Sequence, residues 1–294
     1  MKFLKQFIAI TFFFAIGSLS FAKPIEVFFG TGGRGAEGIY HATFNPDNGK
    51  FSPAKLAAKI GSPGFLAHHP NGKILYSLSR WDGKAGTVGY QRSAGGELKE
   101  FTRMVCPDGG GAHIAVHPSG KFLLTAQYGG GSTALFPLDA KGNLGEPTIH
   151  EHKGGSKVVQ RRQDSPHPHW CGFSPDGKFA LVPDLGLDQI VIYKVNADKT
   201  AITPHAFGQS VPGGGPRHMR FSIDGKFIYL LNELSLSVTT FSWNPKNGLA
   251  KALTTTPALS EEAKAAESFN SSAEILVHPG GKFVYSSNRG HDSV

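Results

Sequence analysis

His117-Pro118-Ser119-Gly120-Lys121 is the stretch that decides the fold, because versions of it recur along the chain. The other copies are His69-Pro70-Asn71-Gly72-Lys73, Ser174-Pro175-Asp176-Gly177-Lys178, Ser222-Ile223-Asp224-Gly225-Lys226 and His278-Pro279-Gly280-Gly281-Lys282. Their glycines before lysine follow one another at intervals of 48, 57, 48 and 56 residues. Proline sets φ for the first central position of a tight turn, and glycine supplies the positive φ after it. Each copy, called a tag below, therefore predicts a hairpin turn.

Short β-rich runs surround the tags. Residues 122–125 and 227–230 directly follow a tag, residues 189–193 form a third run, and Asn244-Pro245-Lys246-Asn247-Gly248 marks a second turn. Strands this short, separated by turns, exclude a helical solenoid. Four strands in about fifty residues is the size of one propeller blade. The sequence thus predicts an all-β protein, a β-propeller, with the Ala- and Glu-rich residues 260–267 as a loop insertion.

The two ends of the repeat array are irregular. Residues 25–44 look like the second and third strands of a blade without a first strand, and four full repeats follow. The sixth repeat begins near Ser272, and Val294 aligns with the start of a third strand. Open sheet edges are an aggregation liability that a closed ring removes. We therefore expect about five to six blades here, in a propeller that is C-terminally incomplete.

The N-terminus has the pattern of a secretory signal peptide. Lys2 and Lys5 precede an apolar run over residues 7–17, and Ser20-Phe21-Ala22 places small residues before a cleavage site after Ala22. The run is too short to span a bilayer. We predict a signal peptide over residues 1–22, a propeller domain over 23–294, and export to the periplasm or the extracellular space.

The charge distribution and the cysteine content limit the kinds of partner and cross-link that we expect. The formal net charge is +8, with no basic run longer than Arg161-Arg162 and no basic segment interleaved with aromatic residues. This distribution argues against nucleic acid and suits a small anionic ligand. After signal cleavage no membrane segment is expected. Cys106 and Cys171 are the two cysteines, and the sequence leaves open whether they pair.

Aligning the repeats on the turn proline shows which positions carry residues that a purely structural role would not require. Six residues before that position the copies carry Gly64, Ala112, His169, Arg217 and Ala273. Seven residues after the tag lysine they carry Arg80, Tyr128, Leu185, Glu233 and Arg289. Both positions lie at the blade edge away from the tag, so in a ring His169, Arg217, Glu233 and Arg289 should converge near one mouth of the channel. Convergent ionisable groups in a concave place predict a functional site.

Glycine-rich segments precede two of the innermost strands. They are Gly109-Gly110-Gly111-Ala112-His113 and Gly213-Gly214-Gly215-Pro216-Arg217-His218. Such glycines let the backbone approach a ligand closely, and tight packing at the ring axis is an equally good explanation. They are not a phosphate-binding loop, because no Gly-Lys-Ser/Thr follows. The tag histidines His69, His117 and His278 are expected to be structural.

The chain resembles a known family at these positions. Ser165-Pro166-His167-Pro168-His169, Val182-Pro183-Asp184-Leu185-Gly186, Gly215-Pro216-Arg217-His218, Leu231-Asn232-Glu233-Leu234 and Ser287-Asn288-Arg289-Gly290 carry the resemblance. They are similar to the lactonase family of seven-bladed propellers, which includes 6-phosphogluconolactonases of the propeller type and the fungal 3-carboxy-cis,cis-muconate lactonizing enzyme. The family's site carries over as His169, Arg217, Glu233 and Arg289.

The resemblance implies a hydrolase that opens a sugar lactone, of the 6-phosphogluconolactonase type, without a cofactor. His169 would be the general base, since an unperturbed histidine titrates near neutral pH. Arg217 and Arg289 would hold an anionic group or the oxyanion. Glu233 should stay ionised beside them. His167, His218, His113 and Asn288 are expected to contact the substrate.

Three other interpretations stay open at this point. The same groups suit a cycloisomerase that closes a carboxymuconate onto its own carboxylate, and a propeller can also bind a ligand without turning it over. Metal chemistry would use oxygens of Glu233, Asn232, Asn288 and Asp184. We predict a metal-free site, because Arg217 and Arg289 would repel a cation there and no histidine pair has zinc-site spacing.

Overall fold

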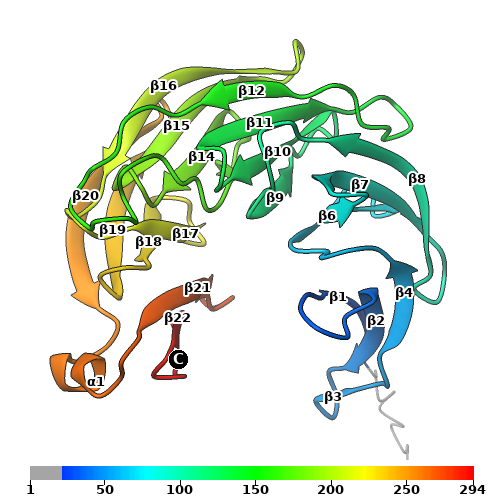
Figure 1. Ribbon diagram of the computed structural model, residues 1–294, viewed down its shortest axis with the longest axis horizontal. Coiled ribbons are helices and arrows are strands. Elements are labelled where there is room, and N and C mark those ends of the chain that lie inside the picture. The colour runs from blue at the N-terminus through cyan, green and yellow to red at the C-terminus, as the bar shows by residue number, and fades with distance from the viewer. Residues whose placement is uncertain (1–21) are drawn as a thin grey trace, which may run out of the picture.

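A computed structural model describes residues 22–294 of the chain. The predicted signal peptide lies, except for Ala22, outside the described residues. Within residues 22–294 no helix has the length and apolar character to cross a membrane. The described residues form six antiparallel sheets, called blades 1 to 6 below, which follow one another around a common centre (Figure 1).

The first three blades are built in chain order. Blade 1 comprises β1 (Ile25–Gly30), β2 (Gly38–Asn45), β3 (Lys50–Phe51) and β4 (Lys55–Lys59). Blade 2 comprises β5 (Leu66–His68), β6 (Ile74–Trp81), β7 (Lys84–Arg92) and β8 (Leu98–Val105). Blade 3 comprises β9 (His113–Val116), β10 (Phe122–Gln127), β11 (Ser132–Pro137) and β12 (Thr148–Glu151).

The other three blades continue the same plan. Blade 4 comprises β13 (Gly172–Phe173), β14 (Phe179–Asp184), β15 (Gln189–Asn196) and β16 (Ala201–Gln209). Blade 5 comprises β17 (Pro216–Phe221), β18 (Phe227–Asn232), β19 (Ser237–Asn244) and β20 (Leu249–Pro257). Blade 6 comprises β21 (Ser271–Val277) and β22 (Val284–Arg289). The all-β propeller architecture is therefore confirmed.

Every tag forms the turn between the first two strands of its blade, as predicted. The tag glycines have φ values between 68° and 71°, the left-handed region that favours glycine. Two tag histidines also join neighbouring blades: the ring nitrogen Nε2 of His69 lies 3.1 Å from the carbonyl oxygen of Gly120, and that of His117 lies 3.0 Å from the carbonyl oxygen of Gly177. The tags therefore tie adjacent blades together at one edge of the ring.

The core lies between neighbouring blades. Middle strands such as β10 are buried on both faces. Because side chains alternate along a strand, Leu123 packs toward blade 2 while Phe122 and Leu124 pack toward blade 4. Cys106 and Cys171 are buried in two different clusters of this core and are free thiols.

The first strands of neighbouring blades contact one another near the centre, as β5 does with β9 and β17 with β21. Blade 1 has no strand of this kind, since β1 pairs with β2 and β2 with β4. Blades 1 and 6 expose apolar side chains, including Phe51 on β3 and Phe283 just before β22.

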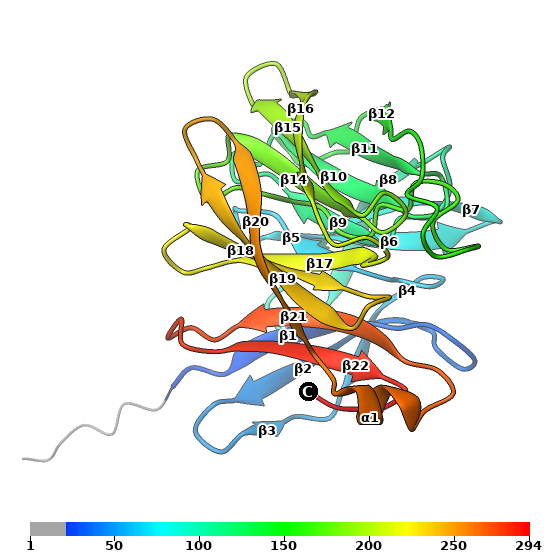
Figure 2. The ribbon, with the colours of Figure 1, turned by 90° about the vertical axis from the view of Figure 1, so that its left-hand side faces the viewer.

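The predicted insertion contains the one α-helix of the described chain, α1 (Glu261–Ala265), between β20 and β21. The hydroxyl of Ser260 caps it by accepting a hydrogen bond from the backbone N–H of Ala263. Figure 2 shows this helix beside the ends of β20 and β22.

Candidate functional site

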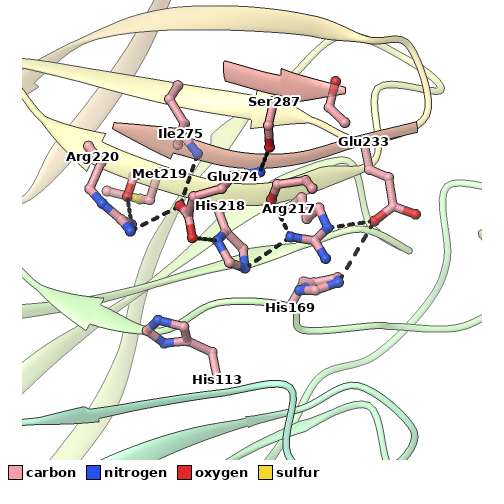
Figure 3. Close-up of polar contacts among 12 residues, drawn as sticks. His113, His169, Arg217, His218, Met219, Arg220, Glu233, Glu274, Ile275 and Ser287 are labelled. Carbon is pink, nitrogen blue, oxygen red and sulfur yellow. Dashed lines mark hydrogen bonds and ion pairs between the residues drawn. The ribbon is translucent and has the colours of Figure 1, made fainter. Parts of the chain in front are cut away.

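The carboxylate of Glu233 is the centre of the site. Its oxygen Oε1 accepts a hydrogen bond of 2.7 Å from Nη2 of Arg162. Its oxygen Oε2 accepts one of 2.9 Å from Nε of Arg217 and lies 3.3 Å from Nη2 of Arg289. The ring nitrogen Nε2 of His169 lies 3.8 Å from the same oxygen (Figure 3). All four residues that the repeat register grouped therefore meet at one carboxylate.

Regular strand pairing places two of these side chains. His169 precedes β13 and donates its backbone N–H to the carbonyl of Pro183, just as Gly64 and Ala112 do to the equivalent residues of their blades. Glu233 follows β18 and donates its backbone N–H to the carbonyl of Gly215. Both residues thus sit at the edge of the blades opposite the tags.

Arg217 is placed by an irregularity in the sheet. The pairing of β17 with β18 shifts between Pro216 and His218, which is a β-bulge at Arg217. Bulges re-aim side chains and are common beside active sites. Here Arg217 is directed to Glu233, and its Nη1 also donates to the carbonyl of Ala273 on β21. The guanidinium is therefore fixed from two blades.

A second carboxylate, that of Glu274 on β21, forms an adjoining network. Its Oε2 lies 3.1 Å from Nδ1 of His218, and its Oε1 accepts a hydrogen bond of 3.0 Å from Nη2 of Arg220. Nε2 of His218 lies 3.4 Å from Nη1 of Arg217. Figure 3 shows the resulting chain from Arg220 through Glu274, His218 and Arg217 to Glu233.

Aromatic rings fill the space where these blades meet. The ring centroid of His218 lies 5.3 Å from that of His169, 5.6 Å from that of His113 and 5.5 Å from that of Phe65. His113 also packs against Trp170 at 5.2 Å. The rings thus form one group of packed aromatic side chains from blades 2 to 5, which joins the Glu233 cluster at His169.

The four residues expected to contact substrate lie in different settings. The ring of His167 stacks on Tyr128, and its Nδ1 lies 2.9 Å from the Tyr128 carbonyl oxygen. His113 and His218 are buried and pack against each other. Asn288 is buried on β22, where its amide oxygen accepts a hydrogen bond from the hydroxyl of Ser272 on β21. Their roles in substrate binding stay predictions.

Arg162 is the member of the site that the repeat alignment did not single out. It lies on the long connection between β12 and β13, away from the two register positions that the alignment compared. This loop is held by Gln163, which is fully buried and donates to the Asp188 carboxylate at 2.6 Å. Asp188 in turn accepts from the backbone N–H groups of Gly213 and Gly215. The basic pair Arg161-Arg162 was the one visible signal in the sequence.

Glu233 is ionised in this setting. Burial disfavours the charged carboxylate, but the hydrogen bond from Arg162 and the positive charges of Arg217 and Arg289 outweigh it and lower the pKa of Glu233. Three guanidinium groups then face one carboxylate. The cluster carries a surplus of positive charge, and Arg162 and Arg289 are partly exposed at its outer side. Such an arrangement attracts an anion.

The expectation that His169 has a pKa near neutral pH is wrong. Burial, followed by the positive charge of Arg217, lowers the pKa of His169 from 6.5 to about 3. The imidazole is therefore neutral throughout the neutral pH range. Its Nδ1 is enclosed and has no hydrogen-bond partner within residues 22–294, whereas Nε2 faces the Glu233 carboxylate.

The oxygens that would have served a metal are engaged elsewhere. Asp184 accepts from the backbone N–H groups of His167 and Gly186 and lies 2.7 Å from Nδ1 of His152. The amide oxygen of Asn232 accepts from the Ser210 hydroxyl. In the described part of the chain no group of three or more His, Cys, Asp or Glu side chains is placed to hold a metal ion.

Comparison with known proteins identifies the family of this fold. The family model described as "Lactonase, 7-bladed beta-propeller" matches residues 26–294. A protein named 6-phosphogluconolactonase from Bacillus subtilis is 34% identical over 88% of this chain and 73% of its own length. A protein of the same name from Formosa agariphila is 33% identical over 95% of this chain and 76% of its own.

A solved structure supports the same family assignment. The periplasmic gluconolactonase of Pseudomonas aeruginosa superimposes with a TM-score of 0.83 and 27% identity, over 91% of this chain and 77% of that one. The repeat, the sheets and the sequence match therefore agree. The chain belongs to the lactonase family of seven-bladed β-propellers.

Proposed function

We propose that this protein hydrolyses the lactone of a sugar acid, at the site centred on Glu233. The observation that carries the proposal is the meeting of three arginines and one neutral histidine at a single buried carboxylate. The names of the two relatives, 6-phosphogluconolactonase, and of the solved gluconolactonase support the same reaction class.

Ester hydrolysis needs a group that stabilises negative charge on the carbonyl oxygen. In our proposal Arg217 and Arg289 hold that oxygen, because preorganised cationic donors stabilise an oxyanion most in the transition state. Arg217 is the stronger candidate, since it is held by both Glu233 and Ala273. Glu233 keeps the guanidinium groups in place and stays ionised.

His169 is the proposed general base. With its hydrogen on Nδ1, Nε2 presents a lone pair to the site and accepts a proton as water attacks the lactone carbonyl carbon. The tetrahedral intermediate then collapses, the ring C–O bond breaks, and His169 returns the proton to the departing hydroxyl. The oxyanion that develops at Arg217 during the attack offsets the Arg217 charge, which after burial is the second cause of the low pKa of His169. The imidazole therefore becomes a stronger base as the transition state forms.

The pH profile tests His169. The rate constant kcat/KM for glucono-δ-lactone, corrected for spontaneous hydrolysis, should show no acid limb between pH 5 and 7.5, because kcat/KM reports the free enzyme and the His169 pKa is about 3. His169→Gln should lower kcat by about 10²–10⁴-fold, as expected when a general base is lost. A limb near pH 6.5 in the parent, or parental turnover in the variant, would contradict the assignment.

Ser119→Ala is a suitable control for this variant. It removes a hydroxyl that contacts a histidine, His117, in a tag at the opposite edge of blade 3. Its kcat should equal that of the parent. If the parent protein opens no lactone at all but binds gluconate, the proposal of hydrolysis fails and a binding function takes its place.

We also propose that the protein is exported. The pattern of residues 1–22 supports this, and the likeness to a periplasmic gluconolactonase is compatible with it. N-terminal sequencing of the protein recovered from the periplasm or medium should begin at Lys23. Protein found only in the cytoplasm with Met1 retained would overturn this.

A further inference from the structure

The carboxylate of Glu274 on β21 has no part in the hydrolysis proposed above, yet groups from blades 5 and 6 hold it firmly. Its oxygen Oε2 lies 3.1 Å from Nδ1 of His218. Its oxygen Oε1 accepts hydrogen bonds of 3.0 Å from Nη2 of Arg220 and of 2.9 Å from the backbone N–H of Ile275. The two oxygens thus face different partners, and Oε1 is held by two donors.

A β-bulge brings His218 against Arg217. On a regular strand the side chains of neighbouring residues point to opposite faces. The pairing of β17 with β18 shifts between Pro216 and His218, and Nη1 of Arg217 lies 3.4 Å from Nε2 of His218. The buried ring of His218 therefore connects the Glu274 carboxylate to the Arg217 guanidinium (Figure 3).

A second bulge lies on the neighbouring strand of blade 6. The pairing of β21 with β22 shifts between Ser272 and Ile275, and Ala273 and Glu274 lie within this bulge. The carbonyl oxygen of Ala273 accepts a hydrogen bond from Nη1 of Arg217. The bulge therefore holds Arg217 twice, once through a backbone carbonyl and once through the Glu274 side chain.

These contacts leave one nitrogen of Arg217 for a ligand. Its Nε donates to Glu233, and the two hydrogens of Nη1 face His218 and Ala273. In the described part of the chain Nη2 has no hydrogen-bond partner. Figure 3 shows the guanidinium beside the ring of His169, the proposed general base. Nη2 is therefore the donor that Arg217 can offer to a ligand oxygen.

The groups at the two ends set the tautomer of His218. An ionised carboxylate only accepts hydrogen bonds, and a guanidinium only donates them. The ring between them therefore carries its hydrogen on Nδ1, toward Glu274, and accepts at Nε2 from Arg217. Burial, as the largest cause, lowers the pKa of His218. Burial opposes ionisation of Glu274, but the hydrogen bond from His218 and the charge of Arg220 outweigh it and lower the pKa of Glu274.

We propose that Glu274 and His218 are positioning residues for Arg217: the carboxylate fixes the tautomer of the imidazole, and the imidazole holds Nη1 so that Nη2 is presented to an anionic oxygen of the ligand. This inference rests on the proposed function, because Arg217 is the group proposed to hold the oxyanion. It assigns no contact with the substrate to either residue.

Glu274→Gln breaks this arrangement without changing its shape. Arg220 and the backbone of Ile275 both donate to the Oε1 position, so the amide oxygen takes that place and the NH₂ group faces His218. The ring must then accept at Nδ1 and carry its hydrogen on Nε2. There it opposes an N–H of Arg217, because two donors meet. The guanidinium loses one of its partners.

The tautomer of His218 can be measured without any turnover. Long-range ¹H–¹⁵N correlation spectra of protein labelled at its histidines show which ring nitrogen carries the hydrogen, and a His218→Asn variant assigns the signals. The parent should carry the hydrogen on Nδ1, and Glu274→Gln should carry it on Nε2. The proposal is overturned if the parent has the Nε2 form, or if the substitution leaves the tautomer unchanged.

A double-mutant cycle tests the positioning of Arg217. In the parent, Glu274→Gln should lower kcat for glucono-δ-lactone by about 5–50-fold, within the range of couplings in one hydrogen-bonded network, while KM changes less. In the Arg217→Gln background the same substitution should change kcat by less than about twofold, because the group on which it acts is gone. An equal loss in both backgrounds, or no loss in the parent, would overturn the proposal.

Glu26→Gln is the matched control. Glu26 on β1 also lies between an arginine and a histidine, Arg92 and His41, and 36% of its side chain is exposed against 34% for Glu274. Arg92 donates to the carbonyl of the tag residue Gly72, at the edge of the blades opposite the Glu233 cluster. The control should keep parental kcat, so a loss confined to Glu274→Gln does not come from removing any such carboxylate.

These measurements separate the positioning role from the proposed reaction. Parental kcat in Glu274→Gln would leave hydrolysis standing and remove the positioning role. If the parent opens no lactone, hydrolysis fails, and the same cycle is measured by calorimetric titration with gluconate, whose carboxylate supplies the oxygens for Arg217. Glu274→Gln should then weaken gluconate binding in the parent background alone, and equal weakening in both backgrounds would overturn the inference.

Discussion

Arg217→Gln will lower kcat for lactone hydrolysis by about 10²–10³-fold, while KM changes much less. The loss corresponds to about 3–4 kcal/mol, which is the typical contribution of one oxyanion-stabilising donor. Arg217 is the most enclosed of the three arginines on Glu233, with 14% of its side chain exposed. A charge held in a partly desolvated place interacts more strongly with a developing oxyanion than one in water. Steady-state kinetics on glucono-δ-lactone measure the effect.

Arg103→Gln is the control for this variant. Arg103 on β8 forms a two-pronged pair with Glu100, and both side chains are substantially exposed. Surface pairs contribute less than about 1 kcal/mol, so this variant should keep parental kcat and nearly parental stability. Circular dichroism should show that Arg217→Gln remains folded. A loss of activity no larger than that in Arg103→Gln would exclude Arg217 from oxyanion stabilisation.

Glu233→Gln will lower the free energy of unfolding by about 3 kcal/mol at pH 7. The amide cannot neutralise the guanidinium groups of Arg162, Arg217 and Arg289, which are left facing one another around a side chain that is 6% exposed. Removing one partner of a buried ion pair costs about 3–5 kcal/mol because a charge stays uncompensated. The exposure of Arg162 and Arg289 places the expected value at the low end. Urea denaturation measures it.

The difference in unfolding free energy between the parent and Glu233→Gln should change with pH in a definite direction. The folded state lowers the pKa of Glu233 below its ordinary value of 4.5. Its contribution to stability is therefore fully present above pH 4.5 and is lost as the pH falls through the folded-state pKa. The gap between parent and Glu233→Gln should be constant from pH 6 to 8 and shrink in acid. Equal denaturation midpoints at pH 7 would contradict the prediction.

The buried histidines make both the parent and Glu233→Gln less stable in acid. Burial, as the largest cause, lowers the pKa values of His113, His169 and His218 below 6.5. Their neutral forms stabilise the fold above pH 6.5, and this stabilisation is lost as the pH falls below that value. Comparing the two proteins at each pH cancels most of this term, so the remaining difference reports Glu233.

The blades could be predicted from the sequence because their signals are local. A tag such as His117–Lys121 carries its own turn chemistry in the proline and glycine, and the strands beside it need only alternate apolar residues. The same repeat also allowed equivalent positions of different blades to be aligned. Since equivalent positions of a repeat lie at equivalent places in the ring, alignment grouped His169, Arg217, Glu233 and Arg289, whose side chains meet in the structure. Their catalytic roles stay predictions.

Contacts outside the repeat could not be predicted in this way. Arg162 reaches Glu233 from the long connection between β12 and β13, where the tag alignment gives no register position. Glu274 reaches His218 because the pairing of β21 with β22 shifts between Ser272 and Ile275. A bulge adds a residue to one strand and turns the following side chains, and no local pattern in the sequence marks it.

The sequence by itself thus determined the repeating blades, the turn at each tag and the edge of the ring where ionisable groups gather. Each of these follows from local periodicity. Only the tertiary structure decided the charge state of the site, since the pKa of His169 depends on its burial and on Arg217, 48 residues away. Desolvation and Coulomb interaction act through space between blades, and they have values only once the blades are packed together.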